Sequence, residues 1–127
     1  DMSPDMARQL LGSGYIIGGT ANTFQDIRRL VAMGVDYIGL GPYRYTETKK
    51  NLSPILGIQG YRDIVIQCRK ENITAPIVAI GGITADDIPL LYDAGVQGIA
   101  LSGTILNAPD PAEETRNIIQ IIDRQNK

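Results

Sequence analysis

The chain has 127 residues, 43% of them hydrophobic and 20% charged, which is a composition typical of one globular domain. Its net charge of −2 gives no general attraction to nucleic acid, and no apolar run approaches the roughly 18 residues of a membrane span, so we expect a soluble cytoplasmic protein. Histidine is absent and Cys68 is the single cysteine, which excludes histidine-dependent hydrolytic triads and cysteine-based zinc clusters.

Helix and strand signals alternate along the chain. Ser3 and Pro4 are typical of a helix start, and Gly12 ends that helix. Apolar residues spaced by three or four positions predict helices, and short continuous apolar runs predict buried strands. The predicted helices lie at about 4–11, 24–33, 61–71, 86–93 and 111–124, and the predicted strands at 15–18, 37–40, 76–80 and 98–101, with a turn at 19–23 and an irregular segment at 52–60. The expected apolar residues are Met6, Leu10 and Leu11 in the first helix, Ile27, Leu30 and Val31 in the second, and Cys68, a partly buried and inert thiol, in the third.

This alternation predicts βα units and a parallel sheet. The segment AMGVDYIGLG at 32–41 recurs as DAGVQGIALS at 93–102, which favours a repeating (βα)8 barrel, the TIM barrel. A complete barrel needs about 250 residues, so residues 1–127 are interpreted as a single partial domain, half of a barrel, with an exposed half-core. A four-stranded open sheet is the alternative.

The stretch DYIGLGPYRYTETKK at 36–50 combines a predicted strand with a polar loop. Gly41 and Pro42 end the strand, and the loop then presents Thr46, Thr48, Lys49 and Lys50 within five residues. Hydroxyl and ammonium groups at the carboxyl end of a strand suit a phosphate, because each can donate a hydrogen bond to its oxygens. A solvated loop whose lysines only increase solubility is the alternative interpretation.

Two later strand ends carry glycine or serine. Gly81 and Gly82 allow backbone N–H groups to approach a ligand closely, although they could simply permit a tight turn. Ser102 and Gly103 begin a short helical turn whose N–H groups favour an anion, although Ser102 could be an ordinary cap. Together they match the phosphate site that the last two strand loops of a barrel form with a short helix.

The segments IIGGTANT, DYIGLGP followed by TETKK, PIVAIGGIT and GVQGIALS, in this order, resemble the thiamine phosphate synthase (thiamine-phosphate pyrophosphorylase) family. The resemblance covers essentially the whole chain and implies barrel strands 5 to 8, the carboxyl-terminal half. It implies a transferase of thiamine biosynthesis that joins hydroxymethylpyrimidine diphosphate to thiazole phosphate and releases pyrophosphate. The family's reaction is expected to pass through a dissociative, carbocation-like state with Mg²⁺ holding the leaving group.

The resemblance also implies roles for individual residues. Asp1 matches a metal-binding aspartate. Thr20 and Lys49 match residues that meet the pyrophosphate, and they are the expected catalytic residues. The residues that match the substrate-binding pocket for thiazole phosphate are Thr46, Thr48, Gly82, Ser102 and Gly103, with Lys49 beside them.

The sequence departs from the family pattern at several positions. Tyr45 replaces a common proline, and Arg44 beside it is either a subfamily trait or an extra phosphate contact. Asn22 stands where many members, and the related thiazole tautomerases, carry histidine, which disfavours a tautomerase-like relative. The family's Q-x-R-x-K run and its Asn-Asp metal pair are absent, so we expect this chain alone to be incomplete and inactive.

Three alternatives remain open at the level of sequence. The chain could be a non-catalytic phosphate-binding half-barrel module that pairs with the missing N-terminal half or with a copy of itself. It could also be another phosphate-binding barrel enzyme, such as an indole-pathway isomerase or synthase, although these lack T-x-T-K after the GxGP strand. A thiazole tautomerase-like relative is the third. Under each of them the partners are small molecules rather than nucleic acid or a membrane.

Overall fold

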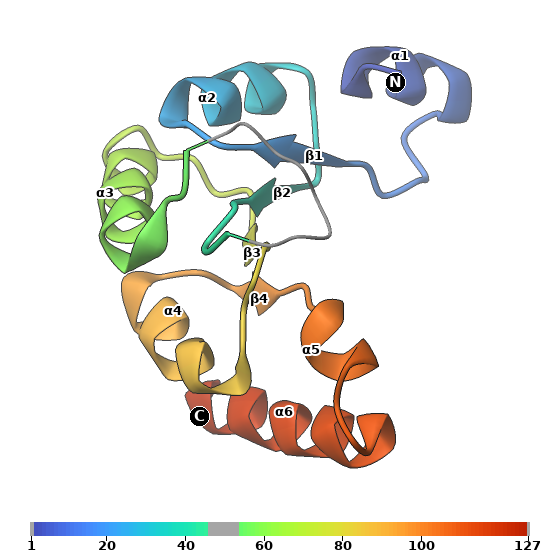
Figure 1. The fold of residues 1–127 in the computed structure, drawn as a ribbon. Coiled ribbons are helices and arrows are strands. Elements are labelled where there is room, and N and C mark those ends of the chain that lie inside the picture. The colour runs from blue at the N-terminus through green and yellow to red at the C-terminus, as the bar shows by residue number, and fades with distance from the viewer. Residues whose placement is uncertain (1, 46–53, 127) are drawn as a thin grey trace.

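The computed structural model describes residues 2–45 and 54–126, which form a parallel sheet flanked by helices (Figure 1). The strand order is β1-β2-β3-β4, the same as the order in sequence, and every neighbouring pair is parallel. The carboxyl ends of all four strands therefore meet at one edge of the sheet. The strands are β1 (Gly18–Ala21), β2 (Tyr37–Leu40), β3 (Ile77–Ala79) and β4 (Gly98–Ile99).

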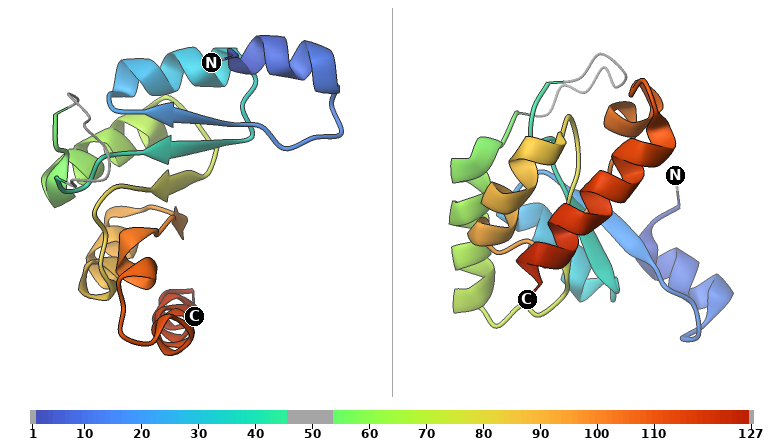
Figure 2. Two further views of the ribbon diagram at one scale, coloured as in Figure 1. Left: turned by 45° about the vertical axis from the view of Figure 1, so that its right-hand side comes forward. Right: turned by 90° about the horizontal axis from the view of Figure 1, so that it is seen from below.

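The helices that follow β1, β2 and β3 lie along one side of this sheet (Figure 2). Thr23 begins α2 with a capping box: its hydroxyl accepts from the N–H of Asp26 at 3.1 Å, and the Asp26 carboxylate accepts from the N–H of Thr23. Gly95 ends α4 in the left-handed conformation, with a φ of 109°. The helices are α1 (Pro4–Leu11), α2 (Phe24–Ala32), α3 (Gly57–Lys70), the 3₁₀ turn η1 (Ala85–Asp87), α4 (Ile88–Ala94), α5 (Gly103–Leu106) and α6 (Pro111–Gln125).

Sequential strand order and one-sided helices distinguish this sheet from a doubly wound one. In a doubly wound sheet the strand order reverses and helices cover both faces. A sheet that adds each strand to the same side, with a helical crossover each time, is the arrangement from which a (βα) barrel is built. The prediction of parallel βα units is confirmed.

The two faces of the sheet differ in burial. The helix-covered face carries Ile38, Leu40, Ile77 and Ala79, each at most 4% exposed. On the other face, a Cβ added to Gly18 would meet the Tyr37 ring, one at Gly39 would meet Ile80, and one at Gly98 would meet Val78. We call this second surface the open face; its residues, which alternate with those of the helix-covered face, are Gly18, Thr20, Tyr37, Gly39, Val78, Ile80 and Gly98.

The main core lies between the sheet and helices α2, α3 and α4. Tyr61 of α3 is fully buried there, and its hydroxyl donates to the carbonyl of Leu40 and, at 3.4 Å, to that of Ile80. Burial raises the pKa of Tyr61, so the hydroxyl stays protonated and remains a donor. One side chain thus links α3 to the carboxyl ends of β2 and β3.

Several predicted boundaries are wrong. The first strand covers Gly18–Ala21 rather than 15–18, and Tyr15 and Ile16 are 60% and 81% exposed. Residues 18–21 form the strand because they pair with β2, although the run before them is more apolar. The third helix begins at Gly57, so residues 57–60 are not irregular, and β4 is shorter than predicted.

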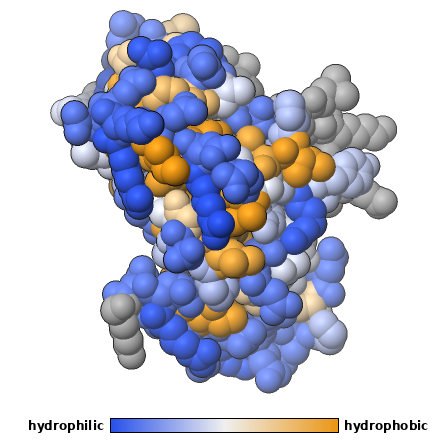
Figure 3. Space-filling view, turned by 90° about the vertical axis from the view of Figure 1, so that its left-hand side faces the viewer, coloured by the Kyte–Doolittle hydropathy of each residue, from blue (hydrophilic) through white to orange (hydrophobic). Residues whose placement is uncertain are grey.

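The first two helices bury fewer apolar side chains than expected. Helix α1 buries none of its residues, and Val31 in α2 is 37% exposed rather than inward. Cys68 is buried more fully than expected, at 3% exposed, and burial raises the pKa of its thiol. The outer side of the helices is mostly hydrophilic, with apolar patches between them (Figure 3). Among the described residues, no helix is long and apolar enough to cross a membrane.

Candidate functional site

The segments that leave the four strands lie side by side at the carboxyl edge of the sheet. In a parallel sheet this edge is where side chains and backbone groups from separate loops can act on one ligand. Here each neighbouring pair of segments is joined by at least one side-chain hydrogen bond. The bonds are made by Asn22, Arg44 and Thr104.

Asn22 connects the exit of β1 to both ends of the loop after β2. Its side-chain amide donates to the carbonyl of Gly41 at 3.0 Å and to that of Pro54 at 2.9 Å. The backbone closes the same base, since the N–H of Leu56 donates to the carbonyl of Pro42 at 2.9 Å. The ends of the segment that contains residues 46–53 are therefore held together.

Arg44 connects the exit of β2 to that of β3. Its Nη1 donates to the Gly82 carbonyl at 2.7 Å and to Oδ2 of Asp87 at 2.7 Å, and its Nη2 donates to Oδ1 of Asp87 at 3.0 Å. The guanidinium also lies over the Tyr43 ring, 5.1 Å from its centroid. Asp87 is 6% exposed, so this is a bidentate ion pair with a buried carboxylate.

Electrostatics at Asp87 favour its ionised form. Burial tends to raise the pKa of this carboxyl, but hydrogen bonds from Arg44 and from the backbone and hydroxyl of Thr84 outweigh burial, so the pKa is lowered. In turn, the hydrogen bond to Asp87 raises the pKa of Arg44. Both groups are therefore charged at neutral pH.

Gly81 and Gly82 both have positive φ, 90° and 71°. A Cβ at Gly81 would lie 2.7 Å from Cα of Pro42, so only glycine allows the exits of β2 and β3 to approach this closely. The Gly81 carbonyl accepts from the N–H groups of Tyr43 and Arg44 at 3.1 and 3.0 Å. Gly81 thus serves the contact between the exits of β2 and β3 in this structure.

Thr104 connects the exit of β4 to that of β3. Its hydroxyl donates to the carbonyl of Ile83 at 2.6 Å. Ser102 precedes α5, and its side chain makes no capping bond to that helix, so it is not an ordinary serine cap. Its backbone carbonyl accepts from Ile105 and Leu106 and starts the helix instead.

The structure brings together four of the predicted site residues at this edge. Thr20 lies near the end of β1, exposed on the open face, and Gly82, Ser102 and Gly103 lie at the exits of β3 and β4. The predicted residues Asp1, Thr46, Thr48 and Lys49 lie outside the described residues. A hollow of about 360 Å³ lies beside the exit of β2; it is lined by Tyr43, Arg44, Tyr45, Ile55 and Gly57.

Sequence reasoning missed the three roles that join the loops. Asn22 was noted only as a replacement for histidine, and Arg44 was interpreted as a subfamily trait or an extra phosphate contact rather than as the partner of Asp87. Asp87 had a detectable signal, because Thr84 followed three residues later by an acidic residue is typical of a capping box. No local signal identifies the Thr104 contact, which depends on two distant strands.

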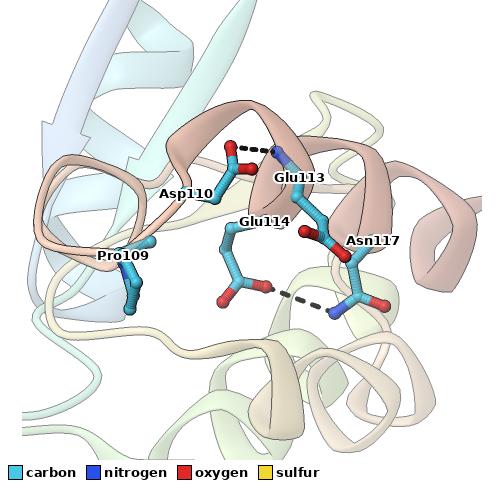
Figure 4. A pocket seen from close by; sticks show the side chains of 6 residues that line it. Pro109, Asp110, Glu113, Glu114 and Asn117 are labelled. Atoms are coloured by element: carbon cyan, nitrogen blue, oxygen red, sulfur yellow. Dashed lines mark hydrogen bonds between the residues drawn. The ribbon is translucent and has the colours of Figure 1, made fainter.

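Metal-binding groups are sparse in the described part of the chain, where no three acidic or cysteine side chains gather at a point that could hold an ion. An acidic hollow of about 380 Å³ lies beside the start of α6 (Figure 4). There, Asp110 accepts from the N–H of Glu113 and Glu114 accepts from Asn117, so these carboxylates stabilise the first turns of α6. Their negative charge disfavours a phosphate at this place.

Comparison with known proteins gives consistent matches. The sequence model of one family, thiamine monophosphate synthase, matches residues 1–105. The chain is 60% identical over 121 residues to thiamine-phosphate synthase of Bacteroides thetaiotaomicron, covering 95% of this chain and 58% of that protein. It is 49% identical over 125 residues to the synthase of Flavobacterium johnsoniae, covering 98% and 57%. Its fold is similar to that of thiamine phosphate pyrophosphorylase from Pyrococcus furiosus, with a TM-score of 0.83, 28% identity, and coverage of 98% and 56%.

The chain therefore spans less than three fifths of the length of these relatives. The match nevertheless includes all four strands and their exits, because the matched residues extend from 1 to 105.

Proposed function

Because the chain belongs to the thiamine monophosphate synthase family, we propose that it supplies the thiazole-phosphate pocket and part of the pyrophosphate site of a thiamine phosphate synthase. Such an enzyme joins hydroxymethylpyrimidine diphosphate to thiazole phosphate and releases pyrophosphate. One observation carries the proposal: the exits of all four strands are joined in order, β1 to β2 to β3 to β4, by side-chain hydrogen bonds at the edge where the family-matched residues lie.

In this proposal the thiazole phosphate binds at the exits of β3 and β4. Backbone N–H groups near Gly82 and Gly103, together with the Ser102 hydroxyl, would donate to the phosphate oxygens. Helix α5 has only four residues, so its contribution comes from individual amides rather than from a helix dipole. Thr46 and Thr48 would add hydroxyl donors from the loop after β2.

The pyrophosphate binds on the side of β1. Thr20 is exposed at the end of that strand and can donate its hydroxyl, and Lys49 would place a positive charge between two anionic substrates that otherwise repel each other. Orienting both substrates and stabilising the departing charge are contributions that need no proton transfer by the protein, which agrees with the absence of histidine.

A magnesium ion is part of this proposal, with Asp1 as the carboxylate of this chain that is matched to it. Mg²⁺ is usually held by one or two carboxylates, water and substrate phosphates rather than by a full protein cage, so Asp1 together with the pyrophosphate oxygens would hold the ion in this proposal. When bound, the ion would neutralise the charge that develops on the leaving pyrophosphate. The described residues provide no competing acidic cluster at the strand exits.

We further propose that β1 to β4 are strands 5 to 8 of a (βα)8 barrel. The partly exposed open face and the one-sided helices support this assignment, because side chains from eight strands together fill the interior of such a barrel and four strands leave it half filled. The 121 matched residues make up 58% of the Bacteroides thetaiotaomicron relative, and the rest of that protein is long enough for the other four strands and their helices. On its own the chain would lack the pyrimidine-binding part of the site.

The test compares the 127-residue chain with a chimera in which the Bacteroides thetaiotaomicron synthase supplies all residues beyond the 121 matched ones. We expect the chimera to form thiamine phosphate and the chain alone to form none. In the chimera, Lys49→Ala should lower kcat by about 100-fold or more, as loss of a charge-stabilising donor does elsewhere. Lys70→Ala at the exposed end of α3 is the matched control and should leave activity unchanged.

Two results would contradict the proposal. An inactive chimera would refute the assigned reaction, and rapid turnover by the chain alone would refute the incomplete site.

A second candidate function is favoured by the open face, which the described residues leave partly exposed. The chain could be a non-catalytic phosphate-binding module that completes a barrel by pairing with a copy of itself. Light scattering separates the two proposals, because a chain that remains monomeric at high concentration would not be such a self-pairing module.

A further inference from the structure

We infer that Arg44 and Asp87 are positioning residues that fix the backbone of the thiazole-phosphate pocket, and that Arg44 does not itself bind the phosphate. This inference rests on the proposed function. The inference assigns Arg44 a role in positioning the backbone, whereas the sequence alone leaves it as either a subfamily trait or an extra phosphate contact.

The first step is the geometry of the pair. Both Nη atoms of Arg44 donate to the two carboxylate oxygens of Asp87, at 2.7 and 3.0 Å, and Nη1 also donates to the Gly82 carbonyl. Asp87 additionally accepts from the N–H and the hydroxyl of Thr84, at 2.8 and 3.0 Å. Four donors therefore converge on one carboxylate that is 6% exposed.

The second step is what Arg44 would lose by turning to a phosphate. Asp87 would then remain buried without its charge partner, which is strongly unfavourable. Its carboxylate also neutralises the guanidinium charge locally, so the attraction of Arg44 for an anion is reduced. The Arg44 side chain is thus committed to the contact between the exits of β2 and β3.

The third step is what this contact does to the backbone. The Gly82 carbonyl points to Arg44, and in a trans peptide the N–H of the next residue, Ile83, points to the opposite side. The following peptide is fixed as well, because the Ile83 carbonyl accepts from Thr104 and the Thr84 N–H donates to Asp87. Two consecutive peptide planes after β3 are therefore held in one orientation.

The fourth step links this rigid segment to the neighbouring loop. Arg44 lies two residues before Thr46, and its own N–H donates to the Gly81 carbonyl at 3.0 Å. The ion pair therefore sets the distance between the exit of β2, as far as Tyr45, and the N–H groups after β3. Both are expected to hold the same phosphate.

The experiment measures steady-state kinetics in the chimera described above. The variants are Asp87→Asn, Arg44→Met, Arg44→Lys and the double variant R44M/D87N. Asn keeps an oxygen that can accept from Thr84, so D87N removes the charge pair and preserves the cap. Arg8→Met is the matched control, because Arg8 donates to Asp36 at 2.8 Å at the amino end of β2, away from the strand exits.

We expect D87N and R44M each to raise KM for thiazole phosphate about tenfold, with kcat changed less than threefold. The double variant should also show about a tenfold increase rather than a hundredfold one, because both changes remove the same interaction. Arg44→Lys should restore part of the loss. Calorimetric binding of thiazole phosphate without the second substrate checks that KM reports affinity. For the control, Arg8→Met should lower Tm without changing KM.

Three outcomes would overturn the inference. If R44M raises KM while D87N leaves it unchanged or lowers it, Arg44 binds the phosphate directly. If the variants lower Tm but leave KM and the calorimetric affinity unchanged, the pair is merely structural. If the unsubstituted chimera neither binds thiazole phosphate nor forms product, the proposed function fails and this inference falls with it; an active chimera with unaffected variants refutes only the inference.

Discussion

The helix-covered face and the open face of the sheet show how stability and the candidate site are separated in this chain. The first buries large side chains such as Ile38 and Leu40 against α2, α3 and α4. The second carries glycines and Thr20, one of the residues matched to the site. Parallel sheets are normally covered on both faces, so the open face identifies where further chain or a partner is expected.

The largest expected effect comes from the helix-covered face. Leu40 is fully buried there, and Leu40→Ala should lower the free energy of unfolding by about 3 kcal/mol through lost burial and the resulting cavity. Val78→Ala on the open face is the control and should cost at most about 1 kcal/mol in the 127-residue chain, because Val78 is only partly buried. Urea denaturation measures both.

The same pair of variants tests the proposed barrel. In the chimera the remaining strands would cover the open face, so Val78→Ala should become markedly more costly while the cost of Leu40→Ala stays about the same. Equal costs for Val78→Ala in the chain and the chimera would show that nothing packs on this face.

The carboxyl edge of the sheet gives the next largest expected effect on the free energy of unfolding. Gly81→Ala forces a Cβ to within 2.7 Å of the Pro42 backbone and also strains a positive φ, so we expect a loss of about 2 kcal/mol or more. Gly34→Ala is matched in φ, at 83°, but has open space around it and should cost about 1 kcal/mol. If the two variants are equally stable, the close approach of the loops does not constrain Gly81.

The sequence was sufficient for the elements whose signals are local. β2 lies at the predicted residues, because an apolar run bounded by Asp36 and Gly41 has one plausible register. The bounds of α1 likewise follow from nearby residues, because Ser3 and Pro4 mark its start and Gly12 its end. The first strand was misplaced because Gly18–Ala21 has little β-propensity of its own and is a strand only through pairing with β2.

The candidate site was predictable in location but not in its internal contacts. Glycine and hydroxyl residues at successive strand ends indicate the carboxyl edge, and the structure places Gly82, Ser102 and Gly103 there. The bonds between loops join residues as far apart as Arg44 and Asp87, a separation of 43 positions, so no local pattern reveals them. Asp1, Thr46, Thr48 and Lys49 remain predictions.

A smaller effect is expected at the hydroxyl that links the core to the strand exits. Tyr61→Phe removes the hydrogen bonds to the carbonyls of Leu40 and Ile80 but keeps the ring, so it should cost about 1 kcal/mol. Tyr92→Phe on α4 is the control, since its hydroxyl has no hydrogen bond to another described residue, and it should change stability by less than about 0.5 kcal/mol. Equal effects would mean that the Tyr61 hydroxyl does not hold the sheet edge.

The smallest expected effect is a pH dependence at the same edge. The pKa of Asp87 is lowered from its ordinary value of 3.8, so its ionised form stabilises the fold fully above about pH 4, and that contribution is lost as the pH falls through the lowered pKa. Asp87→Asn cannot titrate, so the difference in Tm between the unsubstituted chain and this variant should shrink from pH 6 to pH 3. A difference that stays constant over this range would show that the contribution of Asp87 to stability does not depend on the charge of its carboxylate.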